Sequence, residues 1–235
     1  MKIALIGYGK MGKAIEQIAL DRGHDIIARF DADGIDPKVL KDADVAIEFS
    51  QPDAVFENLQ QCMALQVPVV CGTTGWLEKQ KEIELKCINA DSAFLYASNF
   101  SIGVNIFFAV NRYLAEMMNT QSQYEVEIEE IHHTQKLDAP SGTAITLAND
   151  IIARLDRKVK WVKEESQNHD ELGIFSIRED PAPGTHLVSY SSEIDTIDIV
   201  HTAHSRTGFA SGAVMAAEWL AGKKGVFSMS DMLGF

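Results

Sequence analysis

Apolar residues follow two different periods along the first hundred positions of the chain. Short, nearly continuous apolar runs predict strands buried on both faces, whereas apolar residues three or four positions apart predict amphipathic helices. The helical spacing of three or four positions occurs at Ile15, Ile18 and Ala19. These residues lie between the short apolar runs KIALI and HDIIARF. Strands that alternate with helices in this way are typical of a parallel sheet with helices on both faces. The expected strands are KIALI, HDIIARF, DVAIE, PVVC and AFLYA.

The pattern changes near Tyr124, where EVEIEEIHH alternates charged and apolar residues. A period of two predicts a sheet with one solvated face. We expect a long amphipathic helix before it, over about 103–118, and a second helix that begins at Ser141. A polar connection over 157–171 then leads to strands around GIFSIR, THLVSYSS and DTIDIVHTA. After Arg206 an alanine-rich run predicts a helix that returns to the first domain.

These elements predict an α/β chain with two domains. One is an N-terminal Rossmann-type parallel sheet that the C-terminal helix completes, and the other is an α+β domain with a mixed open sheet. The expected domains comprise residues 1–102 with 207–235, and residues 103–206.

Composition narrows the classes of partner and compartment. A net charge of -13 over 235 residues argues against nucleic acid or an anionic membrane surface as the main partner. Cys62, Cys71 and Cys87 form an odd set without CxxC spacing, which predicts neither a disulfide framework nor a structural zinc site. The opening apolar run ends at Gly7, so it indicates a buried strand and not a signal peptide, and no apolar run approaches the roughly 20 residues that cross a bilayer. We therefore expect a soluble, cytoplasmic protein with no membrane partner.

A glycine-rich turn follows the first expected strand. GYGKMG matches G-x-G-x-x-G, in which Gly7 permits a tight turn, Gly9 lets the backbone approach a diphosphate and Gly12 allows a helix to pack closely on the strand. The helix N-terminus adds amide donors and a positive dipole. Asp31, 19 residues after Gly12, is a candidate for the ribose hydroxyls and favours NAD, while Arg29 nearby leaves NADP use open. The alternative is that these glycines serve chain geometry alone.

Three other segments stand at expected strand ends: Glu48 to Ser50, Cys71 to Gly75 and Ala97 to Phe100. Ligands of open parallel sheets lie beyond the carboxyl ends of the strands. The small residues Gly72, Thr73 and Thr74 suit contact with a nicotinamide or ribose. Each segment also has a simpler interpretation as an ordinary turn.

A helix N-terminus stands in the chemically densest segment, between residues 129 and 144. Ser141 after a proline has the character of an N-cap, so Gly142 and Thr143 would present free amides to an anion such as a carboxylate. Lys136 adds a positive charge and an acid.

Two adjacent histidines, His132 and His133, precede this helix, and one imidazole is suited to move a proton near neutral pH. The alternative is a polar surface at the end of a strand. A metal site in which His201 and His204 join the pair is a further alternative. Their spacing is atypical of zinc sites and Lys136 would repel a cation, so we expect no metal ion.

Seven motifs occur in the same order as those of the dihydrodipicolinate reductases: GYGKMG, EFS, CGTTG, ASNFSIGVN, HHTQKLDAPSGTA, GIFSIR and HTAHSRTGFASGA. The chain resembles that family from Ile3 to about Leu220. The resemblance implies a Rossmann domain, a substrate and oligomerisation domain, and a homotetramer. It also implies an enzyme of lysine and diaminopimelate biosynthesis that uses NADH or NADPH, or both, to reduce a small cyclic imine dicarboxylate, 4-hydroxy-tetrahydrodipicolinate, to tetrahydrodipicolinate.

The resemblance further implies roles for individual residues. His132 takes the position of a proton donor or acceptor, and Lys136 that of a proton donor. The substrate-binding positions are His133, Ser141, Gly142 and Thr143. The cofactor-binding positions are Gly7, Tyr8, Gly9, Lys10, Met11, Gly12, Asp31, Gly72, Thr73, Thr74, Ala97, Ser98, Asn99 and Phe100. Two other functions are left open: an NAD-dependent amino-acid dehydrogenase of similar architecture, and an NAD-binding sensor without catalysis.

Overall fold

The computed structural model describes residues 1–164, 166, 168–205 and 207–235. The chain forms two compact units, Met1–Ile102 with Thr207–Phe235, and Gly103–Arg206. Among the described helices, none has both the length and the apolar character needed to cross a membrane.

A six-stranded sheet forms the centre of the first unit. Its strand order is β11-β5-β4-β3-β1-β2, and every neighbouring pair is parallel. The inner strands are almost entirely buried, as a sheet covered on both faces requires. The predicted Rossmann-type parallel sheet is therefore confirmed. The strands are β1 (Lys2–Ile6), β2 (Asp25–Phe30), β3 (Val45–Glu48), β4 (Val69–Cys71), β5 (Ala93–Tyr96) and β11 (Gly225–Phe227).

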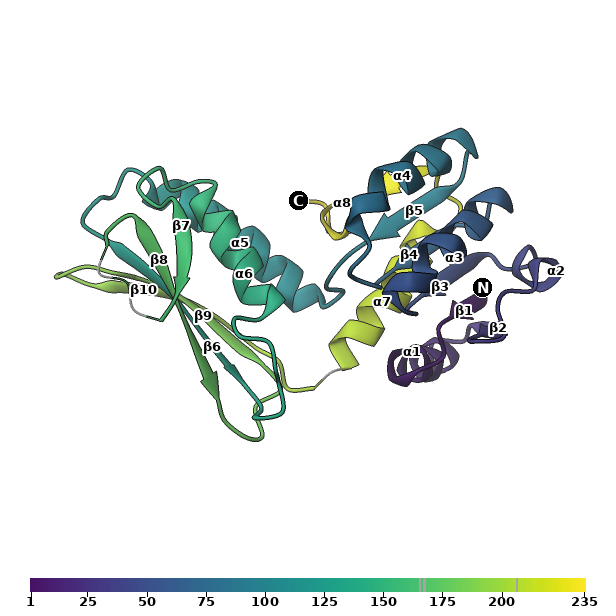
Figure 1. Ribbon diagram of the computed structural model, residues 1–235, viewed down its shortest axis with the longest axis horizontal. Helices are drawn as coiled ribbons and strands as arrows, with labels where there is room; N and C mark the ends of the chain where they lie inside the picture. Colours follow the sequence, from purple (N-terminus) through teal and green to yellow (C-terminus); the bar gives the residue numbers. More distant parts are fainter. Residues whose placement is uncertain (165, 167, 206) are drawn as a thin grey trace. The chain divides into compact units, whose positions relative to one another are not determined.

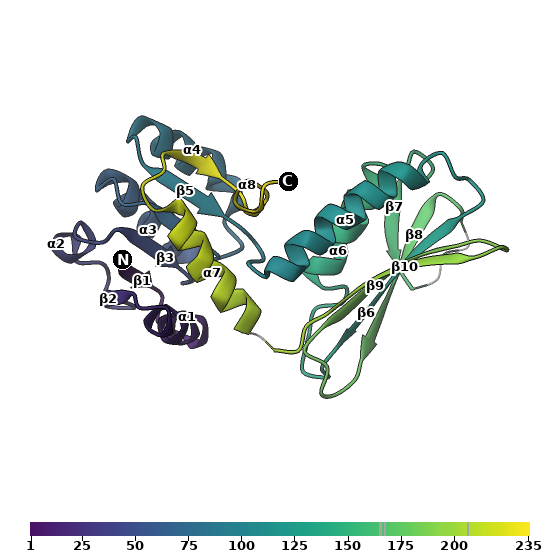
Figure 2. The same ribbon diagram turned by 180° about the vertical axis from the view of Figure 1, so that it is seen from behind.

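Helices pack on both faces of this sheet. Apolar residues of α1 and α7 form one core with alternate side chains of the strands, and those of α3 and α4 form a second core with the remaining side chains. Figures 1 and 2 show α7, near the carboxyl end of the chain, lying along the sheet formed by the first hundred residues. The helices are α1 (Lys10–Asp21), α2 (Pro37–Leu40), α3 (Pro52–Ala64), η1 (Leu77–Lys79), α4 (Gln80–Asn89), α7 (Thr207–Leu220) and α8 (Met229–Leu233).

The second unit has a mixed five-stranded sheet with the order β10-β9-β6-β8-β7. Its central strand, β6, pairs antiparallel with β9 and parallel with β8. The helices α5 (Ile102–Met118) and α6 (Gly142–Ile152) share a core with one face of the sheet, and Figure 1 shows both on the same side. The strands are β6 (Glu125–His132), β7 (Lys160–Lys163), β8 (Glu171–Arg178), β9 (Thr185–Ser191) and β10 (Thr196–Thr202).

The polar connection predicted over 157–171 was wrong in one respect, because it contains the edge strand β7. This strand reads KWVK and pairs parallel with β8 along one side. Four residues with lysine at each end are too short to display a period of two.

Candidate active site

The three glycines of the first turn have different surroundings. Gly7 has φ +88°, and a Cβ there would lie 2.2 Å from the carbonyl oxygen of Phe49. A Cβ at Gly12 would lie 2.3 Å from the carbonyl oxygen of Gly7. A Cβ at Gly9, by contrast, would meet no described atom within 4 Å. The fold therefore requires the first and third glycines, whereas Gly9 leaves space for a ligand.

Gly9 is also the N-cap of α1, and glycine has no side chain with which to cap a helix. The first amides of an uncapped helix are available to an anion. The open space beside Gly9 and the free amides at the start of α1 both fit a dinucleotide diphosphate.

A cavity of about 230 Å³ lies at the carboxyl ends of the strands in this unit. It brings together Met11 of the glycine-rich turn and the predicted cofactor residues after β4. Ser50 donates its backbone N–H to the hydroxyl of Thr73 at 2.8 Å, which ties two of these strand ends together. The lining residues are Met11, Phe49, Ser50, Pro52, Gly72, Thr73 and Thr74.

The segment after β5, Ala97 to Phe100, varies in exposure and includes one side-chain hydrogen bond to the backbone. Ala97 is buried, Ser98 is exposed and Asn99 accepts a hydrogen bond from the amide of Ser101 at 2.9 Å. Phe100 is only 2% exposed, and its ring packs 5.6 Å from that of Phe49. The side chain of Phe100 therefore belongs to the core, and its carbonyl oxygen packs against Gly212 of α7, where a Cβ would lie 1.7 Å from it.

Charged residues surround Tyr8 on the side of α1. The Tyr8 hydroxyl donates to Glu16, and Arg29 donates its Nε to the same carboxylate at 2.7 Å. The hydrogen bond to Glu16 raises the pKa of Tyr8. The charge of Arg29 is thus balanced within the protein, while Asp31 and Lys10 are exposed.

In the second unit, His132 is the last residue of β6 and is 8% exposed. Its Nδ1 lies 3.6 Å from Glu130 Oε2, and its ring centroid lies 5.1 Å from that of His186. Burial lowers the pKa of His132, and the positive charges of Lys136 and Arg178 lower it further, against the opposing charge of Glu130. The imidazole of His132 is therefore neutral at pH 7.

Lys136 lies in the connection between β6 and α6. Its Nζ is 2.8 Å from each carboxylate oxygen of Asp138, and this hydrogen bonding lowers the pKa of Asp138. His133 is partly exposed and lines a cavity of about 320 Å³. The other lining residues are Gln135, Asp180, Pro181, Ala182, Pro183 and Ser205.

Ser141 is the N-cap of α6, as the sequence predicted, and its hydroxyl accepts a hydrogen bond from the amide of Ala144 at 3.2 Å. Its own amide donates to both carboxylate oxygens of Glu130, at 3.1 and 3.0 Å. Gly142 is exposed, and a Cβ there would meet no atom within 4 Å in the described chain. The polar groups of Ser141 thus bind other groups of the protein, whereas Gly142 is exposed and Thr143 is partly exposed.

Sequence reasoning assigned no role to Glu130, His186 or Arg178, which the fold brings to His132. Glu130 lies two residues before His132 on β6, so the period of two already placed both on one face. His186 is on β9 and Arg178 on β8, and no local pattern connects those strands to β6.

The metal alternative involved a different set of histidines. Among the described residues, the group with metal-ligand spacing consists of Glu130, His132 and His186, whose ligand atoms lie within 4.8 Å of one another. Both oxygens of Glu130 already accept hydrogen bonds, and the guanidinium of Arg178 lies 3.2 Å from one of them. This positive charge opposes a cation at the same carboxylate.

A parallel sheet with an open glycine-rich turn, together with a second unit that gathers imidazoles, a lysine and a helix N-terminus, defines a nicotinamide-dependent oxidoreductase. Two family models match the chain: "Dihydrodipicolinate reductase, N-terminus" over residues 1–100, and "Dihydrodipicolinate reductase, C-terminus" over residues 103–233. The chain belongs to the dihydrodipicolinate reductase family. The predicted family and the prediction of a reductase are confirmed.

Relatives support this assignment over the whole chain. The 4-hydroxy-tetrahydrodipicolinate reductase of Christiangramia forsetii is 52% identical over 235 residues, which cover 99% of this chain and 98% of the relative. The enzyme of the same name from Methanoregula boonei is 36% identical over 83% of this chain and 76% of its own length. The dipicolinate-bound dihydrodipicolinate reductase of Paenisporosarcina sp. TG-14 has the same fold, with a TM-score of 0.77, 21% identity and coverage of 97% of both chains.

Proposed function

We propose that this chain reduces 4-hydroxy-tetrahydrodipicolinate to tetrahydrodipicolinate in lysine and diaminopimelate biosynthesis. The observation that carries the proposal is the 52% identity, over nearly the whole of both chains, to a relative named for this reaction. The buried imidazole of His132 and the open N-terminus of α6 agree with it, because the reaction needs a proton and a site for two carboxylates.

The first unit is proposed to bind NADH or NADPH, which supplies the hydride when bound. The amides at the start of α1 hold the diphosphate, and Gly9 allows its close approach. Asp31 accepts hydrogen bonds from the adenosine ribose. The segments after β4 and β5 contact the nicotinamide half, with Phe100 contributing its backbone.

The second unit is proposed to bind the substrate and supply the proton. The amides of Gly142 and Thr143, with His133 and Lys136, hold the two carboxylates. Loss of water from the 4-hydroxy substrate forms a conjugated double bond in the ring. Hydride addition to this bond leaves negative charge on the ring, and a proton must then reach the adjacent carbon. We assign the proton to the ammonium of Lys136, with His132, neutral at pH 7, relaying it to this carbon.

The experiment that tests this function follows NADH and NADPH absorbance with the purified chain. The substrate is generated freshly from pyruvate and aspartate semialdehyde by dihydrodipicolinate synthase. Oxidation that depends on this substrate supports the proposal and ranks the two cofactors. Cofactor binding without turnover would favour a sensor, and reduction of NAD⁺ or NADP⁺ in the presence of an amino acid would favour a dehydrogenase.

NADH is the proposed preferred cofactor, because Asp31 would repel a 2′-phosphate and the guanidinium of Arg29 is held by Glu16. Asp31→Ala should weaken NADH binding by about 10-fold or more, since a hydrogen bond to a charged group contributes about 1.5–3 kcal/mol. NADPH binding should change less. Fluorescence titration of both cofactors measures this, with Asp33→Ala in the same exposed loop as the control. Equal losses for NADH and NADPH would contradict the ribose assignment.

A homotetramer is proposed to form through the second unit. The face of its sheet opposite α5 and α6, which we call the outer face, carries a row across four strands: Val200, Leu187, Glu129 and Phe175. Val200 is 58% exposed in the single chain, and Ile177 on the same face is 39% exposed. Apolar side chains exposed together on one face are typical of an interface.

Val200→Lys should therefore lower the mass in light scattering from four chains to two or one, because it places a charge in the proposed interface. Leu85→Lys is the matched control, because Leu85 is 61% exposed on α4 of the first unit. Four chains in both variants would show that the outer face is not the interface.

A further inference from the structure

A fully buried carboxylate lies beneath the proposed proton-transfer residue. Glu130 has no exposed surface, and it lies on the helix-covered face of β6 with Ile128 and His132. Burial of a carboxylate is costly unless hydrogen bonds compensate for it. Its oxygens accept the amide of Ser141, the hydroxyl of Ser176 at 2.9 Å and the Arg178 guanidinium at 3.2 Å.

These donors decide the charge of Glu130. Burial raises its pKa, but the hydrogen bonds from Ser141 and Ser176 outweigh burial, so the pKa is lowered. Glu130 is therefore an anion at neutral pH, and it is hydrogen-bonded to Ser141 at the start of α6 and to Ser176 on β8.

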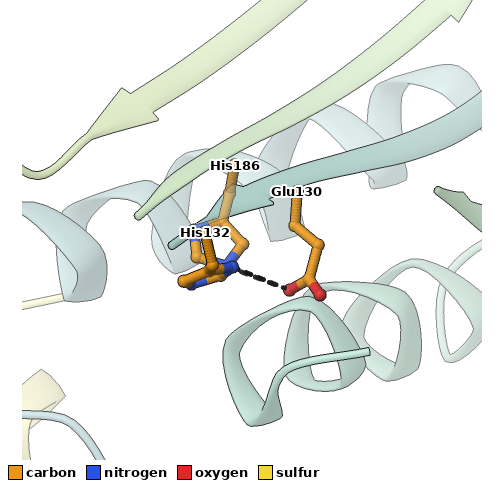
Figure 3. A group of neighbouring side chains, drawn as sticks. All are labelled: Glu130, His132 and His186. Carbon is orange, nitrogen blue, oxygen red and sulfur yellow. Dashed lines mark ion pairs between the residues drawn. The ribbon is translucent and has the colours of Figure 1, made fainter. Parts of the chain in front are cut away.

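Two imidazoles face this anion (Figure 3). His132 Nδ1 lies 3.6 Å and His186 Nε2 lies 3.7 Å from the same oxygen of Glu130. His186 Nε2 is also 3.1 Å from the hydroxyl of Ser141, and burial is the main cause that lowers the pKa of His186 to about 4. His186 is consequently neutral and has a hydrogen-bond partner of its own.

The nitrogens of His132 differ in their surroundings. The Nδ1 is buried and has no hydrogen-bond partner within the described part of the chain, and the carboxylate of Glu130 is the anion that lies 3.6 Å from it. On the other side of the ring, a Cβ built on Gly184 would lie 3.1 Å from Nε2. The glycine keeps that edge of the ring clear.

We propose that Glu130 is a positioning residue of the reductase, which keeps the proton of neutral His132 on Nδ1 and leaves Nε2 to exchange a proton with the substrate. A carboxylate beside one ring nitrogen selects the tautomer that carries its proton there. The same carboxylate stabilises the histidinium that forms when Nε2 accepts a proton. Because Glu130 also binds the amide of Ser141, it links the ring of His132 to the helix N-terminus proposed to hold the substrate. The inference rests on the proposed function for its catalytic consequence, but not for its effect on His132.

The charges that act on His132 come from several elements. Glu130 on β6 and Asp138 raise its pKa, whereas Lys136 in the same connection as Asp138, and Arg178 on β8, lower it. His186 on β9 faces the ring from the remaining side. Removal of the charge of Glu130 therefore shifts the titration of His132 toward lower pH.

The test compares Glu130→Gln with Glu127→Gln, which removes one charge from an exposed position of the same strand. The titration of His132 is followed by NMR of ¹³C-labelled histidine, with His132→Gln identifying its signal. The midpoint pH of the His132 titration should be lower in Glu130→Gln than in the wild-type protein and unchanged in Glu127→Gln. Turnover should fall by about 10-fold or more in Glu130→Gln, with a pH profile displaced in the same direction and NADH affinity unchanged. Glu130→Asp, which keeps the charge, should give His132 a midpoint between those of Glu130→Gln and the wild-type protein.

An unchanged His132 midpoint in folded Glu130→Gln would overturn the proposal, even if turnover fell through lost stability. If the wild-type chain does not reduce the proposed substrate, the NMR result still decides the role of Glu130 toward His132. If Glu130→Gln does not fold, Ser176→Ala replaces it. Loss of one donor leaves the carboxylate freer to interact with His132, so the midpoint should rise, and no change would again overturn the proposal.

Discussion

Replacement of His132 by glutamine is expected to lower the turnover number by about 100-fold or more, the usual contribution of a positioned acid or base. Glutamine retains polarity and much of the volume but cannot take up a proton. NADH affinity should stay within about twofold, because the residues proposed to bind the cofactor lie in the other compact unit. Stopped-flow turnover and fluorescence titration of NADH separate the two effects.

The pH profile provides a second measurement on the same variant. Burial, aided by Lys136 and Arg178, holds the pKa of His132 below its usual value of 6.5. A neutral His132 is required in the proposed relay, so wild-type turnover should decline as the pH falls through that lowered pKa, at a pH below 6.5. The decline should be absent in His132→Gln. His169→Gln, at a side chain 94% exposed in the same unit, is the control. Unchanged turnover in His132→Gln would refute its assigned role.

The second large effect concerns the glycine-rich turn, where two substitutions should destabilise the fold and a third should weaken cofactor binding. Gly12→Ala places a methyl group 2.3 Å from a backbone oxygen, and Gly7→Ala adds a positive φ to a similar clash. A left-handed conformation costs about 1–2 kcal/mol and overpacking about 1–3 kcal/mol, so each variant should lose more than about 2 kcal/mol of unfolding free energy.

Gly9→Ala should instead fold normally. Gly9 has φ -78°, which alanine adopts, and its Cβ would enter open space. The methyl group would occupy the path of the diphosphate, so NADH should bind about 10-fold more weakly or worse. Denaturant unfolding and NADH titration of the three variants distinguish the roles. Normal NADH affinity in Gly9→Ala would contradict the proposed approach of the diphosphate at this residue.

Local pattern was sufficient to predict several features. The parallel sheet follows from alternating periods, because a strand buried on both faces must be apolar along its whole length, as Ala46 and Val70 are. The N-cap at Ser141 follows from hydrogen bonding within four residues. The family follows from motif order, which requires no coordinates.

Long-range pairing was not predictable in the same way. A period of two shows that Glu130 and His132 share a face of β6, but not that β9 and β8 flank that strand. Register across those pairs places His186 opposite Glu130 and Arg178 opposite His132. Short elements such as β7 and β11 were also missed, because three or four residues carry too little periodicity.

The division between these two kinds of feature has a physical cause. Helices, strands, caps and the glycine-rich turn depend on interactions between residues close in the chain, so their signals are present in the linear order of amino acids. The charge of Glu130, the lowered pKa of His132 and the difference between Gly9 and its two neighbours depend on burial and on atoms from distant segments. Those environments exist only after the strands have paired and the helices have packed on them.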